Sequence, residues 1–323
     1  MGYDSLAYGC GVTDELTPAQ QQVLDQLGAD ADHRPSFPTD LRQLLRARLE
    51  AGLAPSMHQL PPDETVFVNK HKLNLVHGCE ARFLAEEEAP FEPNLAMVVG
   101  VVAHKAVELS INWRGEIVPA ELVDQAVASI EHGEYWATDF LQSRTDRELA
   151  ELRSDAVERF ATFSECFPPL KSAWRPVTES RTTVELFDGR LVLRGKVDLT
   201  LGHARGNTAG KVLIDLKTGR FFSTHLDDLR FYALLETMRV GVPPRQLASY
   251  YLDQGELVPE QVTTRLLDTT EARVIDGIRS MIDLLTDERE PVKRPSGACR
   301  WCPILSTCNE GQDHLEADHD ANP

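Results

Sequence analysis

The hydrophobic pattern of this chain changes period in its second half, and this change limits the folds that the chain can adopt. Four helices are expected up to residue 166, whereas Thr182–Phe187 and Arg190–Arg194 alternate between apolar and polar side chains. The Asp188-Gly189 pair between these segments tolerates the positive φ angles of a type I′ turn, so the pattern predicts a β-hairpin. We expect its second strand to continue to Leu201 and a buried strand to follow at Lys211–Lys217.

The order of the remaining elements predicts an α/β fold, in which helices flank a mixed central sheet. We expect helices at Asp40–Ala51, Asn94–Asn112 (with Asn94 as N-cap), Pro119–Ser143, Arg147–Cys166, Asp227–Arg239 and Thr269–Thr286, and strands at Thr65–Val68 and Leu247–Gln254. Residues 1–65 are expected to form an acidic helical leader that prolines interrupt, 66–310 the main domain, and 311–323 an acidic disordered tail. Within the main domain, about residues 113–170 are expected to form a helical insertion.

The composition is that of an ordinary soluble globular protein, with 42% hydrophobic and 26% charged residues. Polar residues break the longest apolar run, and no basic segment of a secretory signal begins the chain, so we expect a cytoplasmic protein without a membrane span. The net charge of −18 argues against unspecific coating of nucleic acid. Residues 171–220, however, hold ten Lys and Arg against five Asp and Glu, which is compatible with a DNA-binding groove.

Two acids and a lysine on neighbouring strands carry the most chemical information. Asp198 ends the Arg194-Gly195-Lys196-Val197-Asp198 segment, and Asp215-Leu216-Lys217 follows seventeen residues later. Side chains alternate along a strand, so Asp215 and Lys217 share a face, and Asp198 can point into the same space. Two carboxylates beside an ammonium suit a hard divalent cation such as Mg²⁺ or Mn²⁺. A surface location for all three is the alternative, but the apolar residues around Asp215 favour a buried strand, where carboxylates need a partner.

His104 is a further candidate ligand for the same cation. It lies in the apolar helix expected at 94–112, with Gly100 four residues before it and Glu108 four residues after it, on one helical face. Imidazole can join carboxylates around Mn²⁺ or Mg²⁺. Glycine at position 100 would permit close approach of another chain or of a phosphate backbone. A single histidine on an apolar helix is more often an ordinary core residue, so the sequence leaves both interpretations open.

Three of the six cysteines lie close together near the carboxyl end. Cys299, Cys302 and Cys308 follow a C-x2-C-x5-C spacing, and Cys79 is available as a fourth thiolate from more than two hundred residues away. Four thiolates suit either tetrahedral zinc or an iron–sulfur cluster, and in either case the group would join the two ends of the domain. Cys10 and Cys166 have no cysteine neighbours and are expected to be ordinary thiols.

The order of these motifs resembles that of the RecB-like PD-(D/E)XK nucleases with an iron–sulfur staple, such as the AddB nuclease domain and the CRISPR-adaptation exonucleases. Those families show a cysteine, G-x-x-x-H, G-x-x-D, (D/E)-x-K, Q-x-x-x-Y and C-x2-C-x5-C. The resemblance spans about residues 66–310 and implies a restriction-endonuclease-like fold. One position departs from it: the segment 228–232 carries Tyr232, but Asp228 stands at the glutamine position. An acid there would repel the DNA backbone or bind a partner.

The resemblance implies roles for single residues. His104, Asp198, Asp215 and the Leu216 carbonyl would hold Mg²⁺ or Mn²⁺, Lys217 would orient the attacking water, and Tyr232 would contact DNA. The cluster held by the four cysteines would be 4Fe–4S, with structural Zn²⁺ as the alternative. Position and charge alone suggest backbone phosphate contacts for Arg194, Lys196 and Arg220, and Gly100 and Asp228 would lie near the DNA.

The expected function is that of a metal-dependent DNA exonuclease, which hydrolyses phosphodiester bonds at single strands or DNA ends in repair, recombination or processing of foreign DNA. Other repair or recombination proteins are conceivable partners. The alternative is a nuclease fold without activity that serves a repair complex as a DNA-binding or scaffold subunit. Asp228 and the acidic composition favour the alternative, whereas the intact set of His104, Asp198, Asp215 and Lys217 argues against it.

Overall fold

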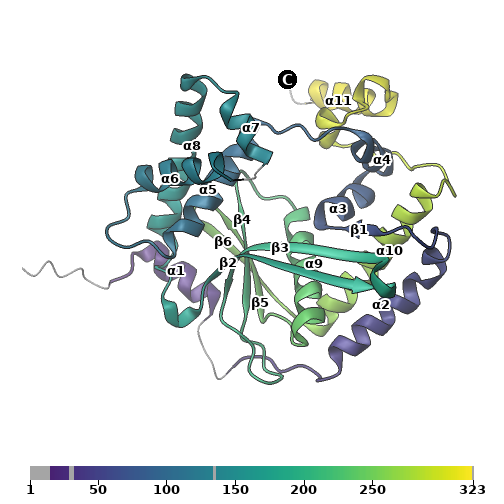
Figure 1. The fold of residues 1–323 in the computed structure, drawn as a ribbon, viewed down its shortest axis with the longest axis horizontal. Coiled ribbons are helices and arrows are strands. Elements are labelled where there is room, and N and C mark those ends of the chain that lie inside the picture. Colours follow the sequence, from purple (N-terminus) through teal and green to yellow (C-terminus); the bar gives the residue numbers. More distant parts are fainter. Residues whose placement is uncertain (1–14, 29–32, 134–135, 322–323) are drawn as a thin grey trace, which may run out of the picture.

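A mixed six-stranded sheet forms the centre of the computed structural model, which describes residues 15–28, 33–133 and 136–321 (Figure 1). Its strand order is β1-β3-β4-β5-β6, and β2 pairs with β3. The strands are β1 (Val66–Val68), β2 (Val177–Leu186), β3 (Leu191–Leu201), β4 (Val212–Lys217), β5 (Gln246–Tyr251) and β6 (Glu256–Gln261). β1 and β3 run parallel, as do β4 and β5, while the other pairs are antiparallel. The predicted mixed α/β fold is therefore confirmed.

The hairpin of β2 and β3 is the longest pairing in the sheet, and it confirms the hairpin predicted from the alternating pattern. The turn differs from the prediction. Leu186 pairs with Leu191, so four residues connect the strands, and Phe187, Asp188 and Gly189 all have positive φ angles. The predicted two-residue type I′ turn is thus wrong, because Phe187 leaves the strand one residue before the Asp-Gly pair.

Helices cover both faces of the sheet. The described helices are α1 (Pro18–Leu27), α2 (Leu41–Met57), α3 (Lys70–Gly78), α4 (Glu80–Glu88), α5 (Leu95–Ser110), α6 (Pro119–Glu131), α7 (Trp136–Gln142), α8 (Asp146–Cys166), α9 (Thr224–Val240), α10 (Thr264–Leu285) and α11 (Asn309–Ala321). One core joins α2, α3, α9 and α10 to the sheet, and the other joins α1 and α5–α8 to it. β4 is buried between the two cores, because Leu213 belongs to the first and Ile214 to the second.

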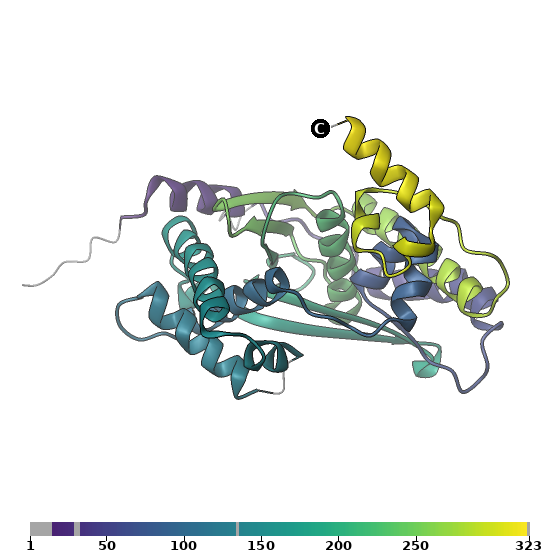
Figure 2. The ribbon, with the colours of Figure 1, turned by 90° about the horizontal axis from the view of Figure 1, so that it is seen from above.

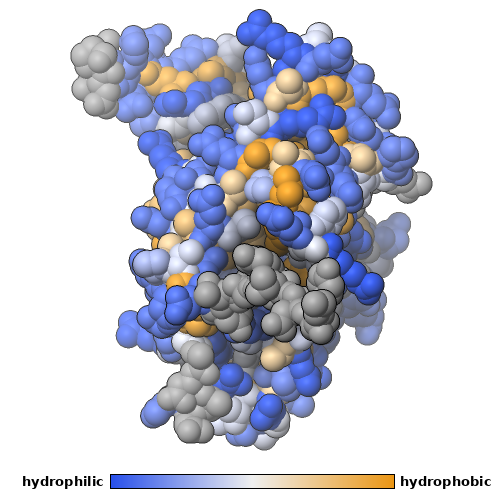
Figure 3. Space-filling model, turned by 90° about the vertical axis from the view of Figure 1, so that its left-hand side faces the viewer, coloured by the Kyte–Doolittle hydropathy of each residue, from blue (hydrophilic) through white to orange (hydrophobic). Residues whose placement is uncertain are grey.

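The segment from α5 to α8 forms a helical layer at one side of the sheet (Figure 2), and α6, α7 and α8 lie within the helical insertion expected at about residues 113–170. Asn94 caps α5 by accepting a hydrogen bond from the Met97 backbone, as predicted. The single helix predicted at 119–143 is instead two helices, α6 and α7. Seen from the side of α1 and α6, the surface is mostly hydrophilic, with apolar residues showing between the polar ones (Figure 3).

Sequence reasoning missed β6, which pairs with β5 across the turn at Gly255. Its alternation is weak, and Pro259 in its centre argued against a strand. β6 is an edge strand of the sheet, where the missing N–H of proline is tolerated.

The boundaries expected at the two ends of the chain do not match the packing. Helix α2 lies in the residues assigned to a leader, yet Leu45, Leu49 and Leu53 are fully buried in the same core as the sheet. Pro55 lies within α2 instead of ending it. The tail expected to be disordered is helical from Asn309 to Ala321 as α11. None of the helices in the described part of the chain is long and apolar enough to cross a membrane.

Candidate functional site

The two central strands separate at the point where their acidic residues lie. β3 pairs with β4 only through Leu199–Leu201. Just beyond this pairing, the Asp198 side chain replaces the backbone acceptor of β3: its Oδ2 accepts a hydrogen bond of 2.8 Å from the backbone N–H of Leu216. Asp198 also marks the place where β3 passes between the two cores, since Val197 packs in one and Leu199 in the other. The fork between β3 and β4 thus fixes one carboxylate beside the end of β4.

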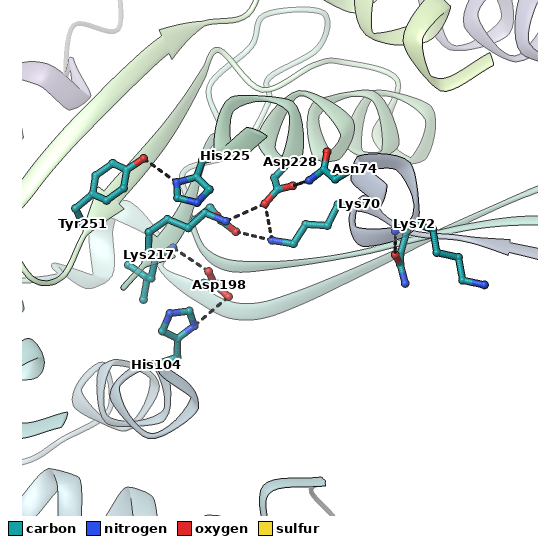
Figure 4. Close-up of polar contacts among 12 residues, drawn as sticks. Lys70, Lys72, Asn74, His104, Asp198, Lys217, His225, Asp228 and Tyr251 are labelled. Atoms are coloured by element: carbon teal, nitrogen blue, oxygen red, sulfur yellow. Dashed lines mark hydrogen bonds and ion pairs between the residues drawn. The ribbon is translucent and has the colours of Figure 1, made fainter. Parts of the chain in front are cut away.

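His104 reaches this fork from helix α5. Its Nδ1 lies 3.4 Å from Oδ1 of Asp198 (Figure 4). Burial lowers the pKa of His104, but the carboxylate of Asp198 outweighs it and raises the pKa above its usual range. For Asp198, burial acts to raise the pKa, yet His104 and the Leu216 N–H hold it well below its ordinary value. The predicted approach of these two residues is therefore present.

Asp215 is the most deeply buried acid of the site, with 1% of its surface exposed. Its Oδ2 lies 2.5 Å from Nζ of Lys217, but the two atoms do not have hydrogen-bond geometry, and this oxygen has no other partner among the described residues. Burial raises the pKa of Asp215 although Lys70 and Lys217 act against this effect. The Lys217 ammonium offsets part of the cost of burying this carboxylate, whose oxygens are of the type that binds a hard cation.

Lys70 is the residue of the site that sequence reasoning missed. It is the first residue of α3, whose N-cap Asn69 accepts a hydrogen bond from the Lys72 backbone. Its Nζ lies 3.4 Å from Oδ1 of Asp215 and 3.1 Å from Oδ2 of Asp228. The only signal in the sequence is a lysine beside an N-cap asparagine, which does not indicate that this helix begins next to β4.

Asp228 joins the two lysines. The residue is 6% exposed on α9, and its Oδ2 lies 2.9 Å from Nζ of Lys217 and within reach of Lys70 (Figure 4). Its Oδ1 accepts a hydrogen bond of 2.7 Å from the Asn74 amide. Burial alone would raise the pKa of Asp228, but the two ammonium groups lower it below its ordinary value. Of the two roles that we expected for this acid, the structure shows the binding of partners.

Tyr232, one turn further along α9, is 5% exposed, and Nζ of Lys70 lies 5.2 Å from the centroid of its ring. Gly195 on β3 makes room for this ring, because a Cβ at that position would come within 2.8 Å of it. Gly100 is different: a Cβ there would lie 3.5 Å from Oγ1 of Thr218, an ordinary contact. The glycine of the G-x-x-D segment is thus required by packing, while that of the G-x-x-x-H segment is not.

The three basic residues suggested as phosphate contacts occupy two different places. Arg194 and Lys196 are exposed on β3 and line a cavity of about 370 Å³ together with Lys70 and Tyr232. Lys196 is ion-paired with Glu179 of β2. The third residue, Arg220, lies in the loop between β4 and α9. Their contact with DNA stays a prediction.

The four predicted cysteines line one cavity of about 350 Å³. This cavity lies between helices α3 and α4 on one side and the 293–311 segment on the other. Cys79 and Cys299 accept hydrogen bonds from the backbone N–H groups of Arg294 and Ser296, at 3.5 and 3.3 Å. Glycine at position 311 faces Cys299 and Cys308, since a Cβ there would lie 3.5 Å from both sulfurs. Cys166 lies elsewhere, against Gly255, and Cys10 is outside the described residues.

Neither the fork nor the cysteine cavity forms a finished metal site. Within residues 15–28, 33–133 and 136–321, no three His, Cys, Asp or Glu side chains are arranged so that they could hold a metal ion. At the fork, the ammonium groups of Lys70 and Lys217 lie on the carboxylates instead. The arrangement can therefore bind a negatively charged group beside the two lysines, or a cation at the carboxylates once the lysines shift.

Comparison with known proteins gives the family. The model of the PD-(D/E)XK nuclease superfamily matches residues 69–309. This chain belongs to that superfamily. The match includes both strands of the fork, and the Asp215-Leu216-Lys217 segment supplies an acid and a lysine at the spacing for which the superfamily is named. Membership of this superfamily supports a nuclease.

Solved structures give more distant similarities. A candidate exonuclease from Eubacterium rectale is 14% identical with a TM-score of 0.47, and the alignment covers 86% of this chain and 93% of that one. The protein SSO0001 is 15% identical with a TM-score of 0.36, over 83% and 97% of the two chains. Rai1 from Scheffersomyces stipitis is 10% identical with a TM-score of 0.24, over 77% and 68%. The comparison with curated proteins gave no match.

Proposed function

We propose that this PD-(D/E)XK nuclease is a metal-dependent DNA exonuclease that acts on single strands or DNA ends. The observation that carries the proposal is the fork between β3 and β4, where His104, Asp198, Asp215 and Lys217 converge. Nuclease membership and the buried Oδ2 of Asp215, which lacks a hydrogen bond, support a catalytic role for this place.

The residues at the fork fit a hard divalent cation. Carboxylate oxygens of Asp198 and Asp215 are the ligand type that Mg²⁺ and Mn²⁺ prefer, and the imidazole of His104 can complete the set with the Leu216 carbonyl. Because Asp198 raises the pKa of His104, three carboxylates (Asp198, Asp215 and Asp228) are balanced by two ammonium groups and the imidazolium, and a divalent cation would take the place of the His104 proton. When bound, such a cation activates water and offsets charge on a phosphate.

The side chains of the fork then have separate tasks. Lys217 lies next to Asp215 and is placed to hold the attacking water or the phosphate oxygen by donating hydrogen bonds. Asp228 keeps Lys217 in this position from the opposite side. Asp198 holds the end of β4 through the Leu216 N–H and orients the His104 ring. The result would be in-line hydrolysis of a phosphodiester bond.

Digestion of end-labelled DNA tests this proposal. Wild-type protein with Mg²⁺ or Mn²⁺ is expected to release nucleotides from linear single- or double-stranded DNA and to leave a closed circle uncut. Asp215→Ala and Lys217→Ala are each expected to lower the rate by at least about 100-fold, because each removes a charged group from the reacting centre. Asp276→Ala is the matched control, since this carboxylate is 77% exposed. Full activity of both site variants would refute the assignment.

We also propose that Cys79, Cys299, Cys302 and Cys308 hold a 4Fe–4S cluster, as the RecB-like resemblance implies, with zinc as the alternative. The four thiols share one cavity, and backbone N–H groups donate hydrogen bonds to two of their sulfurs. Arg82 and Arg294, which also line the cavity, would offset further negative charge.

Anaerobically purified protein is therefore expected to be brown and to contain iron and sulfide. Cys302→Ser should lose the colour and lower the midpoint of thermal unfolding by several degrees, whereas Cys166→Ser should change neither. A colourless protein with one zinc ion would instead support the alternative metal.

One observation favours a second function, that of a DNA-binding or scaffold subunit without activity. Lys70 and Lys217 already neutralise part of the charge of Asp215 and Asp228, as they would in a site that no longer binds a cation. DNA binding without cleavage in the presence of any of Mg²⁺, Mn²⁺ or Ca²⁺ would decide for this function.

A further inference from the structure

The loop between β4 and α9 presents two neighbouring aromatic side chains next to the fork. Phe221 and Phe222 are each 49% exposed. They follow Lys217, the last residue of β4, by four and five positions, and the Phe221 ring lies near Tyr251, which pairs with Lys217 in the sheet. Half-exposed phenylalanines that adjoin each other on a short loop leave apolar ring surface in water, which burial against a partner would remove.

The rings of His225 and Tyr251 pack against the Phe221 and Phe222 pair. The Phe222 ring lies 5.5 Å from the His225 ring, and Phe221 lies 6.3 Å from Tyr251, measured between centroids. His225 and Tyr251 are joined by a hydrogen bond of 3.0 Å between Nδ1 and the hydroxyl group (Figure 4). Burial lowers the pKa of His225 to about 4, so the imidazole is neutral at pH 7. The loop therefore packs on an aromatic base made of His225 and Tyr251.

The loop is also fixed at its start and carries a cation. The Gly219 N–H donates a hydrogen bond of 2.5 Å to Oδ2 of Asp253. Arg220 places its guanidinium 5.3 Å from the centroid of the Phe222 ring. An arginine stacked on an exposed ring, beside two more aromatic groups, combines a phosphate-binding charge with flat apolar surface. Proteins that bind single-stranded nucleic acid use this combination.

We propose that Phe221 and Phe222 form a stacking platform for an unpaired base of the DNA strand that enters the fork. The inference rests on the proposed nuclease function and specifies its substrate as a strand with unpaired bases. Inside a duplex, both faces of each base are already covered by neighbouring bases, so half-exposed rings on a loop have no base face to contact. Arg220 would contact a phosphate of the same strand. Lys217, at the end of β4, lies only three residues before Arg220 in the chain.

Binding measured without cleavage tests the platform. The probes are a short fluorescent single-stranded oligonucleotide and a fluorescent covalently closed double-stranded circle, which has no terminal base pair with a free face, in buffer without divalent metal. Phe221→Leu and Phe222→Leu keep apolar volume but remove the flat ring, so each is expected to weaken single-strand binding about 10-fold and duplex binding less than about twofold. Phe222→Trp should bind single strands at least as tightly as wild type. Trp301→Leu is the control, because Trp301 is 68% exposed under Arg300 but lies in the cysteine segment.

Removal of single bases from the oligonucleotide identifies the partner of the rings. An abasic position that meets the platform should weaken binding to wild type about 10-fold and should weaken binding to Phe222→Leu little further, since the same contact is removed twice. The proposal would be overturned if the leucine variants lost equal affinity for single strands and duplex. It would also be overturned if, at every position, the loss of affinity caused by the abasic site were as large in Phe222→Leu as in wild type. Should the leucine variants not fold, wild type that tolerates every abasic position would overturn it as well.

The outcome separates this inference from the nuclease proposal. A protein that cleaves DNA while its leucine variants bind single strands like wild type would keep the nuclease proposal and end the stacking proposal. A protein that binds as expected but never cleaves would do the reverse. Hydrolysis of a small phosphodiester without bases gives a further readout, because loss of the platform should leave its rate unchanged.

Discussion

At the residue scale, the fork is a cluster of charges in which two lysines share two buried carboxylates. Lys217 contacts Asp215 and Asp228, and Lys70 contacts the same two acids from the start of α3. Neither acid could stay charged at its depth without these partners, because an unpaired buried carboxylate is strongly destabilising. Lys70 is 30% exposed, so it is also the ammonium that an arriving phosphate can reach most easily.

Lys70→Ala is expected to lower the rate of DNA cleavage by about 10-fold and the free energy of unfolding by about 1–3 kcal/mol, because it leaves a buried acid with one cation fewer. Lys72→Ala is the matched control, since Lys72 lies on the same helix and pairs with Glu87 at the surface. Rate assays on labelled DNA and denaturant unfolding check both values. If the two variants behave alike, Lys70 has no particular role in the site.

At the scale of elements, helix α9 lies so close to β3 that one residue of the strand must be glycine. The ring of Tyr232 and the side chain of Leu235 occupy the space where a Cβ of residue 195 would lie. This contact sets the distance between the helix that carries Asp228 and the strand that carries Asp198. The glycine therefore acts on the site through packing, and it need not touch DNA.

Gly195→Ala is expected to destabilise the protein by about 1–3 kcal/mol, because the added methyl group would lie 2.8 Å from the Tyr232 ring and forces a shift of α9. Gly78→Ala, at the end of α3, has no atom within 4 Å of the new methyl group and should be neutral or slightly stabilising. Thermal unfolding of both variants measures the contrast. An equally stable Gly195→Ala protein would show that α9 is less tightly packed than the structure indicates.

At the scale of the whole molecule, the two ends of the nuclease domain meet beside the cysteine cavity. Glu80 follows Cys79 directly and is 3% exposed. Its carboxylate accepts hydrogen bonds from Arg289, at 2.6 and 2.9 Å, and from the Val292 N–H at 2.8 Å. This contact holds the start of α4 to the segment that leads to the other three cysteines, with or without a metal group between them. Helix α11 completes this end of the molecule beside α4 (Figures 1 and 2).

The Glu80 contact gives a pH dependence of stability. Hydrogen bonds from Arg289 lower the pKa of Glu80 below its ordinary value of 4.5, although burial acts to raise it. A lowered folded-state pKa contributes stability above the ordinary value, and this contribution is lost as the pH falls through the folded-state pKa. At pH 7, Glu80→Gln is thus expected to be less stable than wild type by about 1–2 kcal/mol.

The difference between wild type and Glu80→Gln should shrink when denaturant unfolding is repeated at successively lower pH below 4.5. Glu87→Gln, whose carboxylate pairs with Lys72 near the surface, is the control and should differ little from wild type at any pH. A constant difference for Glu80→Gln across this range would mean that the charge of Glu80 does not strengthen the contact.

Local features of this protein follow from the order of its residues alone. Alternation of apolar and polar residues predicted the β2–β3 hairpin and the buried strand β4, and Asn94 predicted the start of α5, because these patterns depend on neighbours in the chain. Period two along β4 also placed Asp215 and Lys217 on one face. The motif order predicted the fold class and the nuclease superfamily.

Which distant residues meet at the fork depends on how the helices and strands pack together. Lys70 and Asp228 became partners because α3 and α9 pack in the same core, which no local pattern records. Helix α2 joined that core for the same reason, through leucines that a short amphipathic segment could equally present to another partner. Long-range approach depends on the summed packing of all elements, and residues that owe their role to it are visible only once the chain is folded.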